Sequence, residues 1–345
     1  MNLGDLHNPE AARKVIADAR KRFGKKTCLA PDRTACSGPI VAAHTLSAEA
    51  MLRPISRAGY VYMPSYKLIR APQEDAIDFR LKGIRDTSVF NGFCAHHDKQ
   101  LFAPIEDQPF VCSPEQLFLH AFRAVAKESY LKRSQADTTL THEQIANIHG
   151  LPEDAQTEVG HMMELHQAVA AIGAEEIETL KARLDKIYCA QDWSRLVSTI
   201  IPFKKTPTVV ANFVYDPDFD FDGGLLQDLE DLSRPLDHLM ITITPSGAGG
   251  FALLSHLDDA GAAPRCLITS LLQRTDPTTA LLWLTITHAE NIAFSPDWYE
   301  SLSREVKIKL KASLNSNINL RKPRIQLQDC PEFIADWNAE AAFSL

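Results

Sequence analysis

Four side chains that bind soft metal ions form two short pairs in the first third of the chain. Cys28 and Cys36 flank the segment LAPDRTA, in which proline and aspartate favour a turn. Cys94 and His97 are separated by two residues, the spacing of a zinc knuckle that leads into a helix. Three thiolates and one imidazole suit tetrahedral zinc. The sequence therefore predicts a structural Zn²⁺ site; the alternative is buried free cysteines beside a surface histidine.

A further histidine lies between the two pairs. The segment SGPIVAAHTLS begins with a Ser-Gly-Pro turn, continues as a short apolar strand and delivers His44 just before a helix that Ser47 can cap. A histidine at this position would face the zinc loop. It could replace Cys36 or His97 as a zinc ligand, or it could remain free for chemistry. His96 is expected to be a surface residue.

The order of these residues resembles a family of zinc fingers. The two cysteines, then Ala-His-Thr-Leu-Ser, then Gly-Phe-Cys-x2-His-Asp are similar to the treble-clef or HNH-like class, in which such residues surround a ββα core. The resemblance covers roughly residues 25–110. The segments AHTLS and FNGFCAHHDKQLFAPIE are also similar to uncharacterised bacterial proteins of prophage and defence neighbourhoods.

In nuclease members of that class, the histidine at the strand end is the general base, an asparagine orients it and an acidic residue binds the catalytic metal ion. The resemblance places His44, Asn91 and Asp98 in these roles, with Mg²⁺ as the ion. Ala43 stands where an acidic ligand is common, which favours a binding protein over a nuclease. Two other interpretations remain open. Asn91-Gly92 also fits a hairpin turn, and Asp98 also fits a helix cap.

The length of the chain and the distribution of its charge indicate which elements position these residues. Its 345 residues, 45% of them hydrophobic, can form two or three domains. Residues 1–110 carry 16 Lys and Arg against 12 Asp and Glu, whereas residues 111–345 carry 20 against 32. An N-terminal helix capped by Asn8 is expected, and its basic residues predict either nucleic-acid contact or a solvated helix face. These residues are Arg13, Lys14, Arg20, Lys21, Arg22, Lys25 and Lys26.

The pattern changes beyond the zinc-finger region. Residues 113–133 and about 153–190 have apolar residues at helical spacing. The segments TVVANFVY, HLMITITP, GFALLSHL and LLWLTITHAENI favour strands, and the glycine-rich TPSGAGG favours a hairpin loop. The predicted fold class is α+β. It comprises a treble-clef zinc-finger domain (1–110), a helical region (111–205) and an α+β domain with a mostly antiparallel sheet (206–345).

The sequence constrains the function less than it constrains the fold. The N-terminus lacks an apolar signal segment and no run reaches the roughly 18 apolar residues of a membrane span, so we expect a cytoplasmic protein. His256 with Asp258 lies near a strand end, but no nucleophile elbow accompanies them. The predicted function is a zinc-binding HNH-like protein in antiviral defence. It would bind nucleic acid through its basic N-terminal domain, or a phage or other partner protein through its C-terminal domain. The alternative is a metal-dependent HNH-type endonuclease with His44 as general base.

Overall fold

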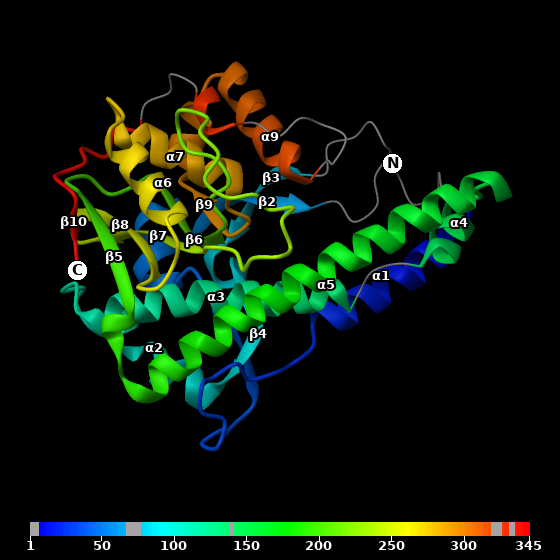
Figure 1. Ribbon diagram of the computed structural model, residues 1–345, viewed down its shortest axis with the longest axis horizontal. Helices are drawn as coiled ribbons and strands as arrows, with labels where there is room; N and C mark the ends of the chain where they lie inside the picture. The colour runs from blue at the N-terminus through cyan, green and yellow to red at the C-terminus, as the bar shows by residue number, and fades with distance from the viewer. Residues whose placement is uncertain (1–6, 67–76, 138–140, 319–325, 331–334) are drawn as a thin grey trace.

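The computed structural model describes residues 7–66, 77–137, 141–318, 326–330 and 335–345 (Figure 1). The α-helices are α1 (Pro9–Phe23), α2 (Ala95–Glu106), α3 (Pro114–Ala136), α4 (His142–His149), α5 (Glu153–Ala190), α6 (Ala263–Leu272), α7 (Pro277–His288), α8 (Pro296–Ser301) and α9 (Arg304–Ile318). The strands are β1 (Ile40–His44), β2 (Tyr60–Tyr66), β3 (Ile77–Gly83), β4 (Val89–Cys94), β5 (Leu196–Phe203), β6 (Val209–Tyr215), β7 (Leu239–Ser246), β8 (Gly249–Leu257), β9 (Ile292–Phe294) and β10 (Phe343–Ser344).

The main sheet has eight strands in the order β10-β5-β8-β7-β6-β9-β2-β3, and their pairings are antiparallel. Its central strands are rich in apolar and β-branched residues, which pack well on a pleated surface. β7 and β8 form a tight hairpin in which Ser246 lies opposite Gly249 and Gly247 has a positive φ of 57°. The α+β class, the antiparallel sheet and the hairpin at the glycine-rich segment are confirmed.

One expected strand is a helix. The segment LLWLTITH belongs to α7, which begins at Pro277 and is capped by the side chain of Asp276. The helix is buried on nearly all sides, so its apolar and β-branched residues carry no helical periodicity that the sequence could reveal. The strand of this region is β9, which lies between β6 and β2.

A hairpin from the N-terminal region forms one edge of the main sheet. β2 and β3 pair along their whole length, and Tyr62 of β2 lies opposite Phe294 of β9. Arg57, just before β2, forms ion pairs with Asp297 at 3.0 Å and Glu300 at 2.6 Å, both on α8. The division into three domains stays a prediction. Strands from all three parts share this sheet, since β5 lies within the region expected to be helical.

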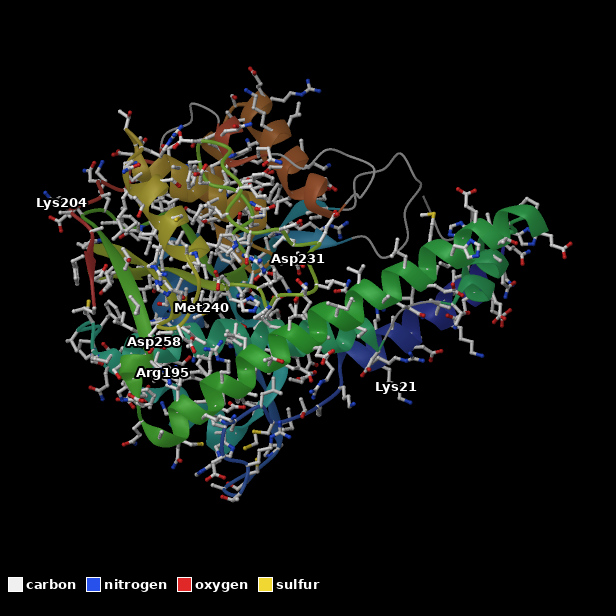
Figure 2. All side chains as sticks on the ribbon, in the orientation of Figure 1. Lys21, Arg195, Lys204, Asp231, Met240 and Asp258 are labelled. Carbon is white, nitrogen blue, oxygen red and sulfur yellow. The ribbon has the colours of Figure 1, made fainter. Side chains whose placement is uncertain are left out.

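Helices cover both faces of the main sheet (Figure 1). α6, α7 and α9 lie over one face, where Leu267 and Leu281 are fully buried. α3 and α5 lie over the other face, where Phe118 of α3 packs in a second core with Met240 of β7, labelled in Figure 2. Phe93 of β4 belongs to this second core, so the region of the predicted metal site rests on the same two helices. No described helix is both long and apolar enough to cross a membrane.

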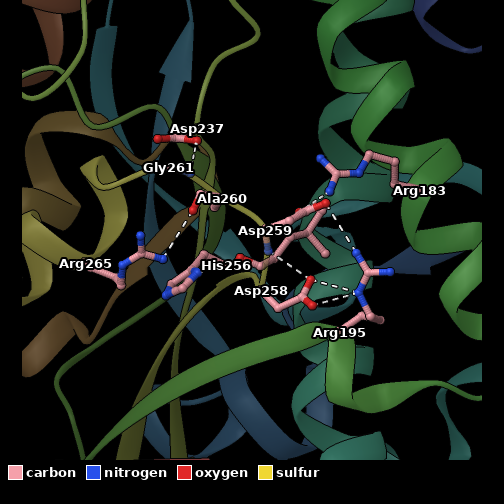
Figure 3. A network of polar contacts seen from close by, with 10 residues as sticks. Arg183, Arg195, Asp237, His256, Asp258, Asp259, Ala260, Gly261 and Arg265 are labelled. Carbon is pink, nitrogen blue, oxygen red and sulfur yellow. Dashed lines mark hydrogen bonds and ion pairs between the residues drawn. The ribbon is translucent and has the colours of Figure 1, made fainter.

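Ion pairs join the C-terminal end of α5 to the connection that follows β8 (Figure 3). Arg195 Nε donates to both carboxylate oxygens of Asp258, at 2.8 and 2.9 Å, and Arg183 of α5 pairs with Asp259. At its other end α5 extends beyond the sheet, and α1 and α4 pack there (Figure 1). The α3–α5 layer is therefore fixed to the sheet on one side and carries the basic helix on the other.

The strand-end residues of β8 do not form a catalytic triad. His256 is buried, with its Nδ1 2.8 Å from the carbonyl oxygen of Leu257. The hydroxyl of Ser255 shares a hydrogen bond with that of Ser198 at 2.7 Å. Since Asp258 is bound by an arginine, this part of the described chain contains no Ser-His-Asp arrangement.

Candidate metal centre

A two-stranded sheet and the helix after it position the metal-binding side chains. β1 and β4 are antiparallel, with Ile40 opposite Cys94 and His44 opposite Val89. α2 begins immediately after β4, so Cys94 ends the strand and His97 lies in the first turn of the helix. The second predicted pair of ligands is thus held by the junction of a strand and a helix.

Backbone hydrogen bonds hold the loop with Cys28 and Cys36 against this junction. The N–H of Leu29 donates to the carbonyl of Gly92 at 2.8 Å, and the N–H of Ala95 donates to the carbonyl of Pro39 at 2.9 Å. These bonds lie on both sides of the loop, so the first cysteine pair is brought beside the second.

Gly92 is required by the packing of β4. A Cβ atom at this position would lie 2.1 Å from Cε2 of Phe90, whose ring covers the backbone. Phe90 is itself buried against Phe93 and Tyr130. The hairpin-turn interpretation of Asn91-Gly92 is wrong, because both residues lie inside β4.

The four predicted ligands converge on one point. Their ligand atoms all lie within 4.8 Å of one another. His97 Nδ1 is 3.4 Å from Cys28 Sγ, 3.5 Å from Cys36 Sγ and 3.3 Å from Cys94 Sγ. A tetrahedral zinc ion with Zn–S of about 2.3 Å and Zn–N of about 2.0 Å places the nitrogen about 3.5 Å from each sulfur. A ring nitrogen has one proton or one lone pair, so it can form one good hydrogen bond at a time. Three sulfur atoms at nearly equal distances from His97 Nδ1 therefore fit a shared metal ion better than a set of hydrogen bonds.

Electrostatics also favours a cation here. Burial lowers the pKa of His97 below its usual value, which keeps the imidazole in the neutral form that binds metals. Desolvation, with the Cys28 thiol beside it, raises the pKa of Cys36 to about 11. Three adjacent thiolates repel one another, so a cation is needed to hold all of them deprotonated. The N–H of Cys94 lies 3.5 Å from Cys28 Sγ and stabilises that sulfur from a second side.

His44 is outside this cluster. It lies at the opposite end of the β1–β4 pair from Cys94, and its Nε2 is 3.3 Å from the carbonyl oxygen of Ile84. His96 is half-buried and packs its ring edge-on against that of His97, with 5.2 Å between the ring centres. The hypothesis that His44 replaces one of the four ligands is wrong. Within the described residues, no other set of three or more histidine, cysteine or acidic side chains gathers as closely.

Asp98 lies in the first turn of α2 but does not cap it, because Cys94 occupies the cap position. Burial raises the pKa of the Asp98 carboxyl, while the charges of Arg123 and His44 oppose this shift. Arg123 forms an ion pair with Glu106 at 2.8 Å, and its side chain is only 4% exposed. Asp98 therefore lies in a partly buried, charged environment directly after the ligand His97.

The third predicted catalytic residue has a different partner. Asn91 Nδ2 donates to the carbonyl of Gly24 at 3.4 Å and so links β4 to the end of α1. In the described chain, no third acidic, histidine or cysteine ligand joins His44 and Asp98 within the distance that a bound ion requires. The catalytic roles of His44, Asn91 and Asp98 remain predictions.

A buried polar stripe on α3 was missed by sequence reasoning. Its residues, each less than a tenth exposed, are Gln116, His120, Arg123 and Lys127. Spacings of four, three and four residues place them on one face of the helix. In the sequence these residues form the polar face of an amphipathic helix, so their pattern predicted exposure to solvent and gave no indication of burial. Gln116 donates to the carbonyls of Pro104 and Pro109, and Arg123 stacks on the ring of Phe102 at 3.9 Å.

Comparison with known proteins identifies no related protein. No protein-family model, curated protein or solved structure gives a significant match to this chain. Its function is therefore inferred from the residues and their geometry.

Proposed function

We propose that this chain is a zinc-stabilised protein of the HNH-like, treble-clef type that binds nucleic acid. The observation that carries this proposal is the convergence of Cys28, Cys36, Cys94 and His97. Their positions, two in a loop, one at a strand end and one in the first turn of a helix, support the ββα core that the resemblance implies.

The proposed zinc is structural. Four protein ligands complete a tetrahedral site and leave no position for the water molecule that a catalytic zinc needs. Phe93 and Phe102, in edge-to-face contact at 5.2 Å, anchor the β4–α2 junction in the core that it shares with α3 and α5. Metal binding would add folding free energy by holding the loop with Cys28 and Cys36 against this junction.

Nucleic-acid binding would use the basic segment, defined as Arg13, Lys14, Arg20, Lys21, Arg22, Lys25 and Lys26, all of them exposed. Figure 2 shows Lys21 on α1, away from the sheet that carries Met240. The end of this segment is fixed on α3, since Tyr130 Oη lies 2.6 and 3.0 Å from the carbonyl oxygens of Phe23 and Lys25. Exposed lysine and arginine side chains on a fixed scaffold can neutralise consecutive phosphates.

The test is fluorescence anisotropy with labelled duplex DNA and single-stranded RNA at several salt concentrations. The variant Arg20→Gln/Lys21→Gln/Lys26→Gln should bind at least about tenfold more weakly, with a salt slope smaller by about 1 for each phosphate that it no longer neutralises. The control Lys204→Gln/Lys205→Gln/Lys309→Gln removes three exposed charges elsewhere and should bind as wild type. Equal affinities for both variants, or wild-type affinity independent of salt, would contradict nucleic-acid binding by this segment.

A second candidate function is metal-dependent cleavage. It is supported by the resemblance, which assigns catalytic roles to His44, Asn91 and Asp98, and by the position of Asp98 directly after His97, where burial raises the pKa of its carboxyl. In this alternative His44 activates water, Asn91 orients it and Asp98 binds Mg²⁺. Incubation of plasmid DNA with protein and Mg²⁺ separates the two functions. Cleavage by wild type that His44→Ala abolishes would establish a nuclease, whereas intact plasmid with retained binding would support the binding function.

A role in antiviral defence is part of the proposal and is supported by the resemblance alone. The partner would be a phage component or another protein bound by the acidic C-terminal region. The connection between β6 and β7 concentrates this charge in Asp216, Asp218, Asp220, Asp222, Asp228, Glu230, Asp231 and Asp237. Bacteria that express the wild-type chain should reduce phage plating, and Cys94→Ser should restore it. Equal plating on both strains for a broad phage panel would contradict this role.

A further inference from the structure

A polar cavity of about 280 Å³ lies between α3, α5 and the end of β6. Its walls also include His238, at the start of the β7 region, and Glu290, in the connection from α7 to β9. None of the four proposed zinc ligands lines it. The cavity is thus a separate feature, placed beside a strand end and under helices, where ligand sites are often built.

The wall contains one buried polar atom without a partner and one buried lysine without an ion pair. Lys127 is 8% exposed and, among the described residues, forms no hydrogen bond or ion pair; its Nζ lies 5.5 Å from the ring centre of Phe90. Asn212 donates through Nδ2 to the carbonyl of His120 at 3.1 Å and to Thr242 Oγ1 at 2.8 Å. Its Oδ1 is buried with no partner in the described chain. An unpaired buried acceptor such as Asn212 Oδ1 costs about 1–3 kcal/mol, so a ligand that donates to it and also pairs with Lys127 is favoured.

Negative charge predominates around the same space. Five carboxylates face two ammonium groups, Lys127 and Lys132, in the lining. The carboxylates belong to Glu128, Glu176, Asp216, Asp218 and Glu290. Burial, and next the charge of Glu290, raises the pKa of Glu128 to about 7. Burial also raises the pKa of Glu176. These carboxyl groups are therefore disfavoured as anions until a cation joins them.

Some of the acids already have partners. Asp216 lies 2.6 Å from His238 Nδ1, and Asp218 accepts a hydrogen bond from Tyr215 Oη at 2.9 Å. Glu128 is 3.9 Å from Lys132 Nζ, a loose contact. Within the described residues, Glu176 and Glu290 form no ion pair. The carboxylates available to a ligand are thus Glu128, Glu176 and Glu290.

The spacing of these acids suits a molecule better than a bare ion. They come from α3, α5 and the α7–β9 connection. In the described chain, no three acidic or histidine ligand atoms of this cavity lie within 4.8 Å of one another. Mg²⁺ and Ca²⁺ need several oxygen atoms at about 2.0–2.6 Å from one centre. A ligand several atoms long can reach each carboxylate separately.

We propose that this cavity binds a small organic cation. Its amine or guanidinium nitrogen would lie among the carboxylates of Glu128, Glu176 and Glu290. An acceptor oxygen of the same molecule would meet the ammonium group of Lys127, and one of its N–H groups would donate to Asn212 Oδ1. The chemical class is that of a basic amino acid: a cationic nitrogen and a carboxylate separated by a short chain. This site is independent of the proposed nucleic-acid binding.

Isothermal titration calorimetry of the full chain tests the proposal, with L-arginine, L-lysine and agmatine as probes and propionate and Mg²⁺ as comparisons. At least one amino-acid probe should bind once per chain, whereas propionate and Mg²⁺ should not. Glu176→Gln should weaken binding at least tenfold. Glu175→Gln, its exposed neighbour on α5, should leave the affinity unchanged. Lys127→Met should weaken binding of arginine but not of agmatine, which has no carboxylate.

Circular dichroism and thermal unfolding of each variant show that it is folded before its binding is compared. Three results would overturn the proposal. The first is the absence of binding heat for all three probes up to low millimolar concentration with folded wild-type protein. The second is binding of Mg²⁺ in place of the probes. The third is equal weakening by Glu175→Gln and Glu176→Gln, which would place the probe elsewhere.

Discussion

Cys94 Sγ and His97 Nδ1 lie 3.3 Å apart, on either side of the point where β4 becomes α2. Three residues of continuous backbone set this separation, so the second half of the metal site is organised locally. Cys28 and Cys36 reach the same point through a loop, and zinc binding would close that loop.

Cys36 and Cys189 offer a matched pair, because both are exposed and free of disulfides. We expect Cys36→Ser to lower zinc affinity at least about tenfold, since the site then lacks one of its four ligands. Cys189→Ser should leave the affinity unchanged. Competition with a chromogenic chelator measures both values, and indistinguishable affinities would remove Cys36 from the ligand set.

Gly92→Ala should destabilise the fold by about 1–3 kcal/mol, because the new Cβ meets the buried ring of Phe90. Gly173→Ala, in the middle of α5, is the control. Its Cβ would have only ordinary contacts with Lys132, and helix propensity predicts a gain of about 0.5–1 kcal/mol. Urea unfolding of both variants should therefore give shifts of opposite sign. A neutral Gly92→Ala would show that β4 does not need a glycine there.

The ion pair of Arg123 with Glu106 should contribute far more to stability than an exposed pair. Glu106→Gln leaves the buried guanidinium without its counter-ion and should cost about 3 kcal/mol or more. Arg133 and Glu178 form a pair at 2.6 Å whose side chains are 48% and 38% exposed, so Glu178→Gln should cost less than about 1 kcal/mol. Denaturant titrations compare the two. Similar losses would mean that the Arg123 environment is not buried in solution.

Lys127 should make stability rise with pH above 8. Burial lowers its pKa from 10.5 to about 8 in the folded chain; the charge of Lys82 acts in the same direction, and those of Glu128 and Glu290 oppose it. Between these values the unfolded chain binds more protons than the folded chain, so raising the pH favours folding by up to about 3 kcal/mol. Lys127→Met should be more stable than wild type at pH 7, and this difference should shrink as the pH approaches 10. A difference independent of pH would contradict the shifted pKa.

The cluster of Cys28, Cys36, Cys94 and His97 was predictable because its sequence signal is local. Cys94 and His97 are fixed by three residues of backbone, and Cys28 and Cys36 by one loop. The antiparallel sheet was predictable from short β-branched segments punctuated by glycine and proline. The pairing of strands that are far apart in the sequence was not predictable. The β2–β3 hairpin joins the main sheet by pairing with β9, and nothing near Tyr62 in the sequence indicates that Phe294 lies opposite it.

Burial on all sides hides the remaining features. The segment that forms α7 was predicted to be a strand, because a helix without a polar face shows no helical period in its sequence. The polar stripe of α3 had the opposite problem, since Arg123 and Lys127 fit the solvent face of an ordinary amphipathic helix. Their burial depends on α2 and the end of β6, which only the folded chain brings together. The position of His44, at the end of the β1–β4 pair away from Cys94, likewise required the register of these strands.

Elemental analysis of the purified chain and two variants is the most direct test of the metal centre. We predict about one zinc ion per chain in the wild type, its loss in Cys94→Ser and its retention in His44→Ala. Absence of zinc from wild type purified without chelators, or retention of zinc in Cys94→Ser, would contradict the site formed by Cys28, Cys36, Cys94 and His97.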